Sequence, residues 1–175
     1  MVFSRSQKEH GGGLTLNIGT YTVQLVSLLM GGVRPISIHT GGILNDNGVD
    51  IAASSTLVYP ESRVVTICMS ATCTLPGEAL IVGSKGNIKV NFPMWCPESM
   101  ETPSGRFSVT LPSHGLAFNV PNAQGFIYEA EEVRKCFSQG LKESPLMPLD
   151  ESIVIAEIME NIRRQIGVSY AQDDR

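Results

Sequence analysis

The 175-residue sequence has few charged and few aromatic side chains. Charged residues make up 17% and aromatic residues 6%, whereas hydrophobic residues make up 42%. A low charged fraction at ordinary hydrophobicity excludes most disordered chains. The formal net charge is −4, so the basic surplus of a nucleic-acid-binding domain is missing too. We therefore expect one folded domain, or one and a small part, that binds no nucleic acid.

Common site motifs are also missing. No G-x-G-x-x-G follows an expected strand, and the sequence has no G-x-x-x-x-G-K-[ST], so it predicts no nucleotide-phosphate loop. It has no G-x-S-x-G nucleophile motif. The three histidines, His10, His39 and His114, are scattered, and no C-x-x-C pair stands near them. The sequence therefore predicts no metal site.

The cysteines favour a reducing compartment. Cys68 and Cys73 are five residues apart, so on a straight strand their side chains point to opposite faces. Cys96 and Cys136 complete the set, and we expect four free thiols. The sequence also has no Asn-x-Ser/Thr glycosylation site. These features predict a cytoplasmic protein, in which Cys96, beside Trp95, has a packing role.

Residues 11–33 carry no charge but contain Thr, Asn, Gln and six Gly residues. We interpret this stretch as too polar for a membrane-spanning helix and expect a buried helix with a glycine-rich entry, hence no membrane association. Apolar residues recur at helical spacing. They are Leu14, Ile18, Tyr21, Leu25 and Leu28/Leu29.

From Ile36 to Leu111 the hydrophobic period changes to two, which is typical of strands. The expected strands cover 36–39, 51–59, 65–73, 79–82, 88–92 and 107–111. Helices return at 128–139 and after Asp150, a predicted N-cap, and the last one ends at Gly167. Its apolar side is expected to be Ile155, Ile158, Met159, Ile162 and Ile166, whereas Glu131, Glu132, Arg163 and Arg164 should lie on solvated helix faces.

This order predicts an α+β fold, with a largely antiparallel, open-faced sheet of about six strands and helices packed on one face. Residues 1–10 form a lead-in and residues 11–175 the domain. The segment from Gly11 to Tyr21 is a glycine-rich helix start with Asn17 and Tyr21 on one face. From the residues alone, the simpler interpretation of Tyr21 is a core aromatic with a satisfied hydroxyl.

A resemblance adds to this interpretation. The segment 11–21 resembles the GGGxLLDxGxY signature that opens the carboxy-terminal domain of Gfo/Idh/MocA oxidoreductases. The closing stretch 142–152, with 162–167, is similar to the end of that domain, and 128–133 resembles its preceding helix. In between, the matching features are 48–50, 83–86 and 95–97. They resemble the dihydrodiol dehydrogenase branch of the family, from about Gly11 to Arg175.

The resemblance implies hydride transfer between a nicotinamide cofactor, NADP, and a trans-dihydrodiol or an aldose. The family's amino-terminal Rossmann domain holds the cofactor and supplies a lysine. That domain is absent from these 175 residues, so no cofactor-binding residue is assigned here. Tyr21 corresponds to the family's proton-handling tyrosine, which needs a nearby cation because free tyrosine titrates at about pH 10. Asn17 replaces the signature Asp and is expected to orient the substrate.

Two further expectations concern the partners. The resemblance implies a homodimer formed through the open sheet face. The chain would then be the substrate-binding and dimerisation half of a dehydrogenase, as a partial record or a truncated product, with little catalysis alone. The alternative is a non-catalytic dimerisation or interaction module, which Asn17 favours because an amide cannot act as a base. A third interpretation, a destabilised fragment, is weaker because the chain is long enough to build its own core.

Overall fold

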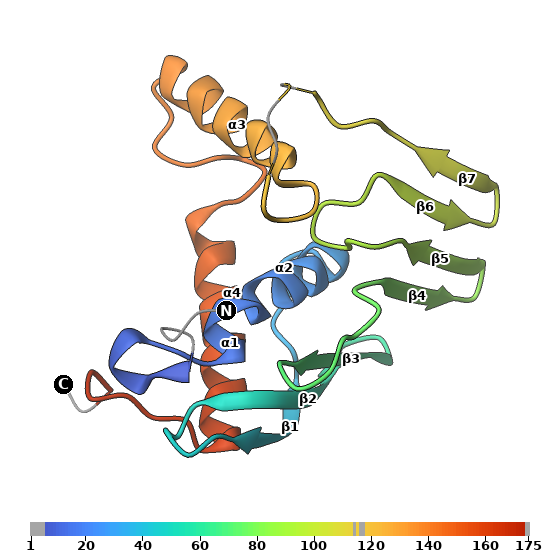
Figure 1. Ribbon diagram of the computed structural model, residues 1–175. Coiled ribbons are helices and arrows are strands. Elements are labelled where there is room, and N and C mark those ends of the chain that lie inside the picture. The colour runs from blue at the N-terminus through green and yellow to red at the C-terminus, as the bar shows by residue number, and fades with distance from the viewer. Residues whose placement is uncertain (1–5, 114, 116–117, 174–175) are drawn as a thin grey trace. The chain divides into compact units, whose positions relative to one another are not determined.

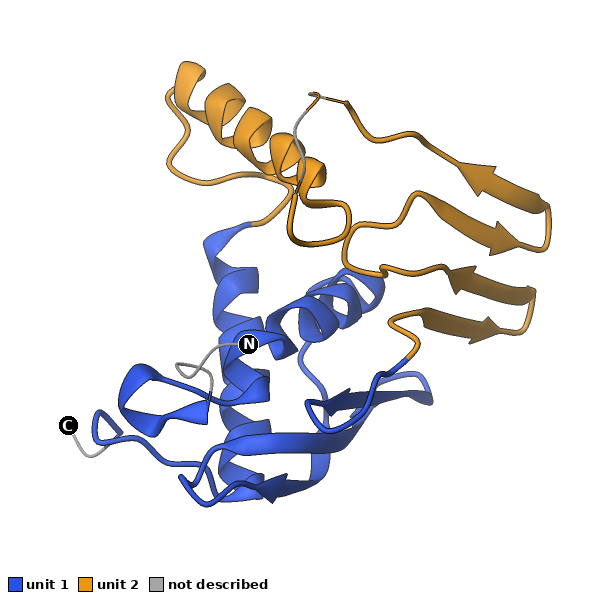
Figure 2. Ribbon diagram, in the orientation of Figure 1, with its two compact units in different colours: residues 1–75, 148–175 blue, residues 76–147 orange. Residues whose placement is uncertain are grey.

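The computed structural model describes residues 6–113, 115 and 118–173, so residues 1–5 of the predicted lead-in and His114 lie outside the described residues. The chain divides into two compact units (Figure 2). Unit 1 joins Met1–Leu75 to Pro148–Arg175, and unit 2 is Pro76–Met147. We describe each unit by itself.

Unit 1 holds a three-stranded antiparallel sheet with helices on one face (Figure 1). The strands are β1 (Ser37–Leu44), β2 (Asp50–Tyr59) and β3 (Arg63–Ser70), in the order β1-β2-β3. The helices are the 3-10 turn Lys8–His10, α1 (Leu14–Asn17), α2 (Gly19–Met30) and α4 (Leu149–Ile166). α4 packs against β1, and its Gln165 side chain exchanges hydrogen bonds of 2.8 Å with the Ile38 carbonyl and the Thr40 N–H.

The core of unit 1 forms where α2 and α4 meet the inner face of the sheet. Along β2, buried and more exposed residues alternate because successive side chains point to opposite faces. Complete burial of one large aliphatic side chain is worth about 1.5–3 kcal/mol. The buried apolar residues are Val23, Val26, Val49, Ala53, Leu57, Tyr59, Ile67, Met69, Val154, Ile155, Ile158, Ile162, Val168 and Tyr170.

Unit 2 contains a four-stranded antiparallel meander followed by a helix (Figure 1). Its elements are β4 (Ala79–Gly83), β5 (Gly86–Val90), β6 (Ser99–Thr102), β7 (Gly105–Ser108), the 3-10 turn Ala123–Gly125 and α3 (Phe126–Ser138). Cys96 packs against Gly125, where an added Cβ would overlap its Sγ, and burial raises the pKa of this thiol. Its surroundings thus agree with the packing role that the sequence predicts.

The structure confirms a mixed helix and strand fold with antiparallel open sheets, here of three and four strands. β6 was not expected, since its sequence Ser-Met-Glu-Thr lacks a hydrophobic alternation. The Asp150 cap was wrong: Pro148 occupies the N-cap position of α4, and Asp150 lies inside the first turn. Gly167 does end α4, in the left-handed conformation.

The expected apolar face of the first long helix was partly wrong. Leu28 and Leu29 are 63% and 45% exposed, whereas Val23, Val26 and Ser27 are buried. The helix therefore turns a face of smaller side chains inward. Gly19, the first residue of α2, is also buried.

The segment Lys8–Met30 is long and apolar enough to cross a membrane by length and composition, since an 18-residue window within it has a mean hydropathy of 1.2. By this criterion its polar residues do not exclude a spanning helix, and the expectation of no membrane association stays a prediction. Core helices and signal sequences pass the same test. Here the segment is split into three helical pieces by Gly11–Gly13 and Ile18, and a third of it is buried.

Candidate functional site

The two predicted site residues lie at the junction of α1 and α2. Asn17 is the last residue of α1 and Tyr21 lies in the first turn of α2, with Ile18 between the two helices. The N–H of Tyr21 donates to the Ile18 carbonyl at 3.2 Å, three residues back, which tightens the chain at this point. Tyr21 is 41% exposed and Asn17 partly exposed, so Tyr21 is not the core aromatic that the residues alone favour.

The first turn of α1 is held by a carboxylate from the sheet. Oδ2 of Asp50, the first residue of β2, accepts hydrogen bonds of 2.7 Å from both the backbone N–H and the hydroxyl of Thr15. Asp50 is only 2% exposed and Thr15 is fully buried. A carboxylate at a helix N-terminus satisfies N–H groups that have no partner inside the helix. Asp50 therefore caps α1 from a distant part of the sequence.

Glycine is required directly before this cap. Gly13 has φ +123°, a conformation that residues with a side chain rarely adopt. A Cβ on Gly13 would overlap Oδ1 of Asp50 and lie 3.3 Å from the Tyr170 hydroxyl. Oδ1 itself has no hydrogen-bond partner among the described residues. The glycine of the signature thus lets a buried carboxylate approach the backbone closely.

Tyr170, in the carboxy-terminal tail, holds the same loop from another side. Its hydroxyl donates to the Gly12 carbonyl at 2.6 Å, across 158 residues of sequence. The side chain is buried, and burial is the largest cause that raises the pKa of Tyr170, followed by the charge of Asp50. A neutral, donating hydroxyl is therefore the favoured form.

The tail is fixed in turn by Arg163, and this corrects the prediction that Arg163 is solvated. Its guanidinium, on α4, is buried and makes two hydrogen bonds of 2.7 Å to the carboxylate of Asp173. It also donates to the Val168 carbonyl at 3.1 Å and lies over the Tyr170 ring at 5.2 Å. This hydrogen bonding lowers the pKa of Asp173 and raises that of Arg163.

Sequence reasoning did not assign these anchoring residues. Asp50 was noticed only as part of the family-like stretch 48–50, and Tyr170 and Asp173 carried no motif. Their partners lie far away in sequence, so no local pattern could have shown them. The one available signal was Asp50 itself, an acidic residue at the start of an otherwise uncharged strand, because a charge that becomes buried there needs a partner.

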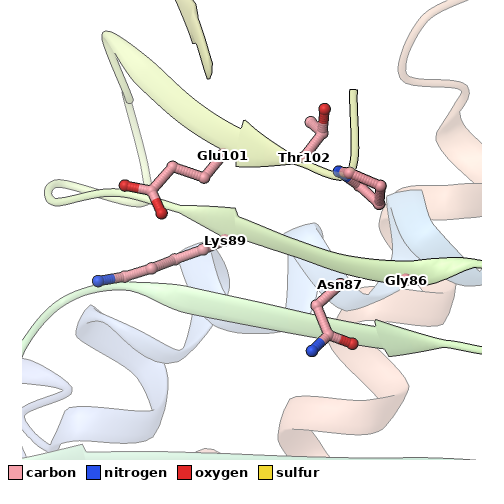
Figure 3. A pocket seen from close by; sticks show the side chains of 6 residues that line it. Gly86, Asn87, Lys89, Glu101 and Thr102 are labelled. Atoms are coloured by element: carbon pink, nitrogen blue, oxygen red, sulfur yellow. The ribbon is translucent and has the colours of Figure 1, made fainter. Parts of the chain in front are cut away.

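Unit 2 has an open depression of its own (Figure 3). It is lined by Gly86, Asn87, Lys89, Glu101, Thr102 and Pro103. The Lys89 ammonium lies 3.0 Å from a Glu78 carboxylate oxygen, and Lys89 and Glu101 are register partners on β5 and β6. Neither Asn17 nor Tyr21 lines it. We read these charges as cross-strand pairs of a solvated sheet.

Within the described part of the chain, no three His, Cys, Asp or Glu side chains gather as metal ligands. The four cysteines are free. The chemistry available at the α1–α2 junction is therefore that of a phenol and an amide, which can hold, donate or accept a proton and orient a hydroxyl group.

Comparison with known proteins places this junction in context. Residues 3–89 match the model of the GFO/IDH/MocA C-terminal domain. Over 169 residues the chain is 42% identical to trans-1,2-dihydrobenzene-1,2-diol dehydrogenase from Danio rerio, covering 97% of this chain and 51% of that protein. The chain belongs to the GFO/IDH/MocA family. It spans about half the length of the curated relatives that it matches.

Solved structures support the fold of this GFO/IDH/MocA chain. A 3-ketoreductase from Actinomadura kijaniata, in complex with NADP and TDP-benzene, aligns with a TM-score of 0.66 at 19% identity, covering 92% of this chain and 48% of its own. An oxidoreductase from Agrobacterium radiobacter, in complex with NAD+, L-tartaric acid and magnesium, aligns with a TM-score of 0.63 at 14% identity. That alignment covers 86% of this chain and 46% of the other. In both, the match is to about half of a larger oxidoreductase.

Proposed function

We propose that this chain is the substrate-binding and dimerisation half of a nicotinamide-dependent oxidoreductase acting on a trans-dihydrodiol or an aldose. The observation that carries the proposal is the placement of an exposed tyrosine directly after the anchored α1 turn. The 42% identity to a dihydrodiol dehydrogenase along nearly the whole chain supports the substrate class.

In this proposal Tyr21 handles the proton of the reacting hydroxyl. During oxidation the deprotonated oxygen of Tyr21 accepts that proton, and during reduction the protonated phenol returns it to the forming hydroxyl. Proton transfer needs a hydroxyl within hydrogen-bond reach of the substrate, which agrees with the exposure of Tyr21. Asn17, four residues earlier, orients the substrate through its amide, which donates and accepts but carries no charge.

The cofactor would be NADP, held mainly by an amino-terminal domain of the kind that the family's resemblance implies. When bound, the nicotinamide supplies or accepts the hydride. Neither Asn17 nor Tyr21 is proposed to hold it. The 3-ketoreductase was solved with NADP and the Agrobacterium radiobacter enzyme with NAD+, so the choice of NADP rests on the resemblance alone. We place this activity in the cytoplasm, in keeping with four free thiols.

We also propose a homodimer through the open sheet face. On the sheet of unit 1, the face away from the helices carries small and apolar side chains, among them Ser54 and Val64. The second candidate function is a non-catalytic dimerisation module. Asn17 favours it, because the amide that replaces the signature Asp cannot act as a base. The two differ in a simple measurement, since the module dimerises but supports no turnover when the other domain is supplied.

The test joins residues 6–175 to the amino-terminal half of the Danio rerio relative and measures NADP-dependent oxidation of a trans-dihydrodiol and of D-xylose. We expect turnover that Tyr21→Phe abolishes, with unchanged NADP affinity, because only the proton-handling hydroxyl is removed. Tyr128→Phe is the matched control: Tyr128 is also exposed, but it lies on α3. Full turnover in Tyr21→Phe would refute the role of Tyr21.

Turnover lost only with Asn17→Ala, and not with Tyr21→Phe, would transfer the main role to the amide. No turnover in the joined protein, together with a dimer in size-exclusion chromatography with light scattering, would favour the non-catalytic module. Asn17→Asp restores the signature residue in the joined protein. Turnover that appears in this variant would mean that only the charge was missing, and continued inactivity would mean that the site itself is not formed.

A further inference from the structure

We propose that the carboxy-terminal tail, and Tyr170 in particular, positions the helix that carries Tyr21. Tyr170 is a positioning residue in this proposal, since it acts through the Gly12–Gly13 loop. The inference deepens the proposed function and rests on Tyr21 being the working residue there. It assigns a role to Arg163, which lies in the family-like stretch 162–167, and to Tyr170 and Asp173, which no family motif marks.

The tail is rigidly held before it reaches the loop. After α4 the chain turns at Gly167, whose φ is +92°, and Val168 is buried. The Arg163 guanidinium donates two hydrogen bonds to the Asp173 carboxylate and one to the Val168 carbonyl, which hold the segment after Gly167 against α4. The N–H of Tyr170 also donates to the Asp173 carboxylate at 2.8 Å. Arg163 is buried and Asp173 is exposed, and their two charge-assisted hydrogen bonds orient the Asp173 carboxylate on the guanidinium.

This arrangement fixes the direction of the Tyr170 side chain. The Arg163 guanidinium lies over its ring, and the hydroxyl reaches the Gly12 carbonyl at 2.6 Å. The ring cannot swing away without separating a buried cation from the aromatic face. The Tyr170 hydroxyl is therefore a donor in a fixed position, and its hydrogen bond holds the Gly12 carbonyl, and with it the loop, in one place.

The loop has a second fixed point one residue further on. Oδ1 of Asp50 lies against Gly13, and Oδ2 of Asp50 bonds Thr15 in the first turn of α1. Gly12 and Thr15 are thus tied to two different elements, the tail and β2. Because hydrogen bonds to two different elements hold residues 12–15, they define where α1 begins and in which direction it runs.

Only one residue separates Thr15 from Asn17, and five separate Thr15 from Tyr21. The N–H of Ile18 bonds the Leu14 carbonyl at 2.8 Å, so the anchored turn passes directly into the junction. A shift of the backbone at Gly12 would therefore move α1 and, through it, the exposed side chain of Tyr21. Placement errors on the scale of 1 Å are enough to cost catalysis.

The experiment uses the 175-residue chain and needs no activity. The sequence has four tyrosines, so ¹³C-labelled tyrosine gives four ring signals that can be assigned by substitution. In Tyr170→Phe the ring stays over Arg163 but the bond to Gly12 is lost. We expect the Tyr21 ring signal to shift or split. Amide exchange at 14–21 should rise about fivefold, the factor for one hydrogen bond of about 1 kcal/mol.

Tyr59→Phe is the matched control. Tyr59 is a buried tyrosine of the same unit whose hydroxyl has no hydrogen-bond partner among the described residues. Its substitution should leave the Tyr21 signal and the exchange at 14–21 unchanged. A second variant, Asp173→Asn, keeps the shape of the tail but weakens the grip of Arg163, and it should move the Tyr21 signal in the same direction as Tyr170→Phe.

Two results would overturn the proposal. One is an unchanged Tyr21 signal in Tyr170→Phe. The other is an equal rise in exchange across β2, α4 and 14–21, which is the pattern of a merely structural contact. Both are read on the chain itself, so they stay distinct from the turnover test. An inactive joined protein whose Tyr21 signal responds to Tyr170→Phe would sink the proposed function alone.

Discussion

The two units differ in how many apolar side chains they bury. In unit 1 a three-stranded sheet packs against α2 and α4, whereas the four-stranded meander of unit 2 leaves many of its apolar side chains exposed. The buried apolar residues described for unit 2 include Leu111 and Cys136, while unit 1 has fourteen, as given above. In unit 2, Leu80, Val82 and Phe137 are 65%, 71% and 86% exposed. The same chain thus contains one unit with a packed interior and one whose strands rest mainly on backbone pairing.

This difference bears on where a site can be built. A reacting group must be held within a fraction of an ångström, which requires neighbours that are themselves fixed. The α1–α2 junction belongs to unit 1, where Asp50, Arg163 and Tyr170 supply buried polar ties. The charged residues that line the depression in unit 2, Lys89 and Glu101, lie on a solvated sheet. The packed unit is therefore the better support for precise chemistry.

The largest expected effect contrasts the two interiors. Leu57→Ala, at a fully buried position of β2, should lower the free energy of unfolding of unit 1 by about 2–5 kcal/mol, because it leaves a cavity. Leu80→Ala, on β4, should change stability by less than about 0.5 kcal/mol. Amide exchange resolved by residue measures both. Equal losses would mean that unit 2 also has a packed core around Leu80.

The next effect tests the close approach at the loop. Gly13→Ala should cost about 2–4 kcal/mol, because it combines a left-handed backbone with overlap against Asp50. The matched control is Gly105→Ala, since Gly105 has a similar φ of +128° but open space around it, and should cost only about 1–2 kcal/mol. Denaturant unfolding measures the difference. Similar costs would show that backbone conformation alone requires glycine at 13.

A smaller effect concerns the tail and depends on pH. Arg163 holds the pKa of Asp173 below its usual range, so the folded state binds fewer protons than the unfolded one on this group. The resulting stability is present above the unfolded pKa of about 3.9 and is lost as pH falls through the folded pKa.

The measurement compares melting temperatures of the wild-type chain and Asp173→Asn from neutral to acid pH. The wild type should melt higher at neutral pH, and the gap should begin to shrink below about pH 4 and close once pH has fallen through the lowered pKa of folded Asp173, where both side chains are uncharged. A gap that is constant with pH would mean that the shape of the side chain, and not its charge, holds the tail.

The smallest effect is expected on the surface of unit 2. Arg134 and Glu131 form an ion pair of 2.9 Å on α3, with both side chains about half exposed or more. Arg134→Ala should change stability by about 0–0.5 kcal/mol, since solvent screens such pairs. Thermal unfolding checks it. A loss as large as that of Leu57→Ala would show that α3 is held by its charges.

Local patterns predicted the elements well and the anchors poorly. The hairpin at 83–86, the strand at 51–59 and the α4 residues Ile155, Ile158 and Ile162 followed from periodicity and turn chemistry, which are encoded within a few residues. The roles of Tyr21 and Asn17 came from the resemblance and stay predictions, although the structure does place both at one exposed junction.

What sequence reasoning missed depends on partners far away in the chain. Arg163 was predicted to lie on a solvated helix face, whereas its buried guanidinium contacts Val168, Tyr170 and Asp173 beyond the helix end. The inner face of α2 was misjudged because Leu is more hydrophobic than Ser or Gly, yet small residues permit closer packing on the sheet. Neither fact is contained in a local pattern.

The bond between Tyr170 and Gly12 also has a consequence during synthesis. Unit 1 is discontinuous, and all of unit 2 is made between its two segments. A ribosome therefore releases the loop, α1 and α2 long before the tail that fastens them exists. Until residues 163–173 have been synthesised, the helix bearing Tyr21 lacks this hydrogen bond, so we expect unit 1 to complete its packing only after unit 2 has been made.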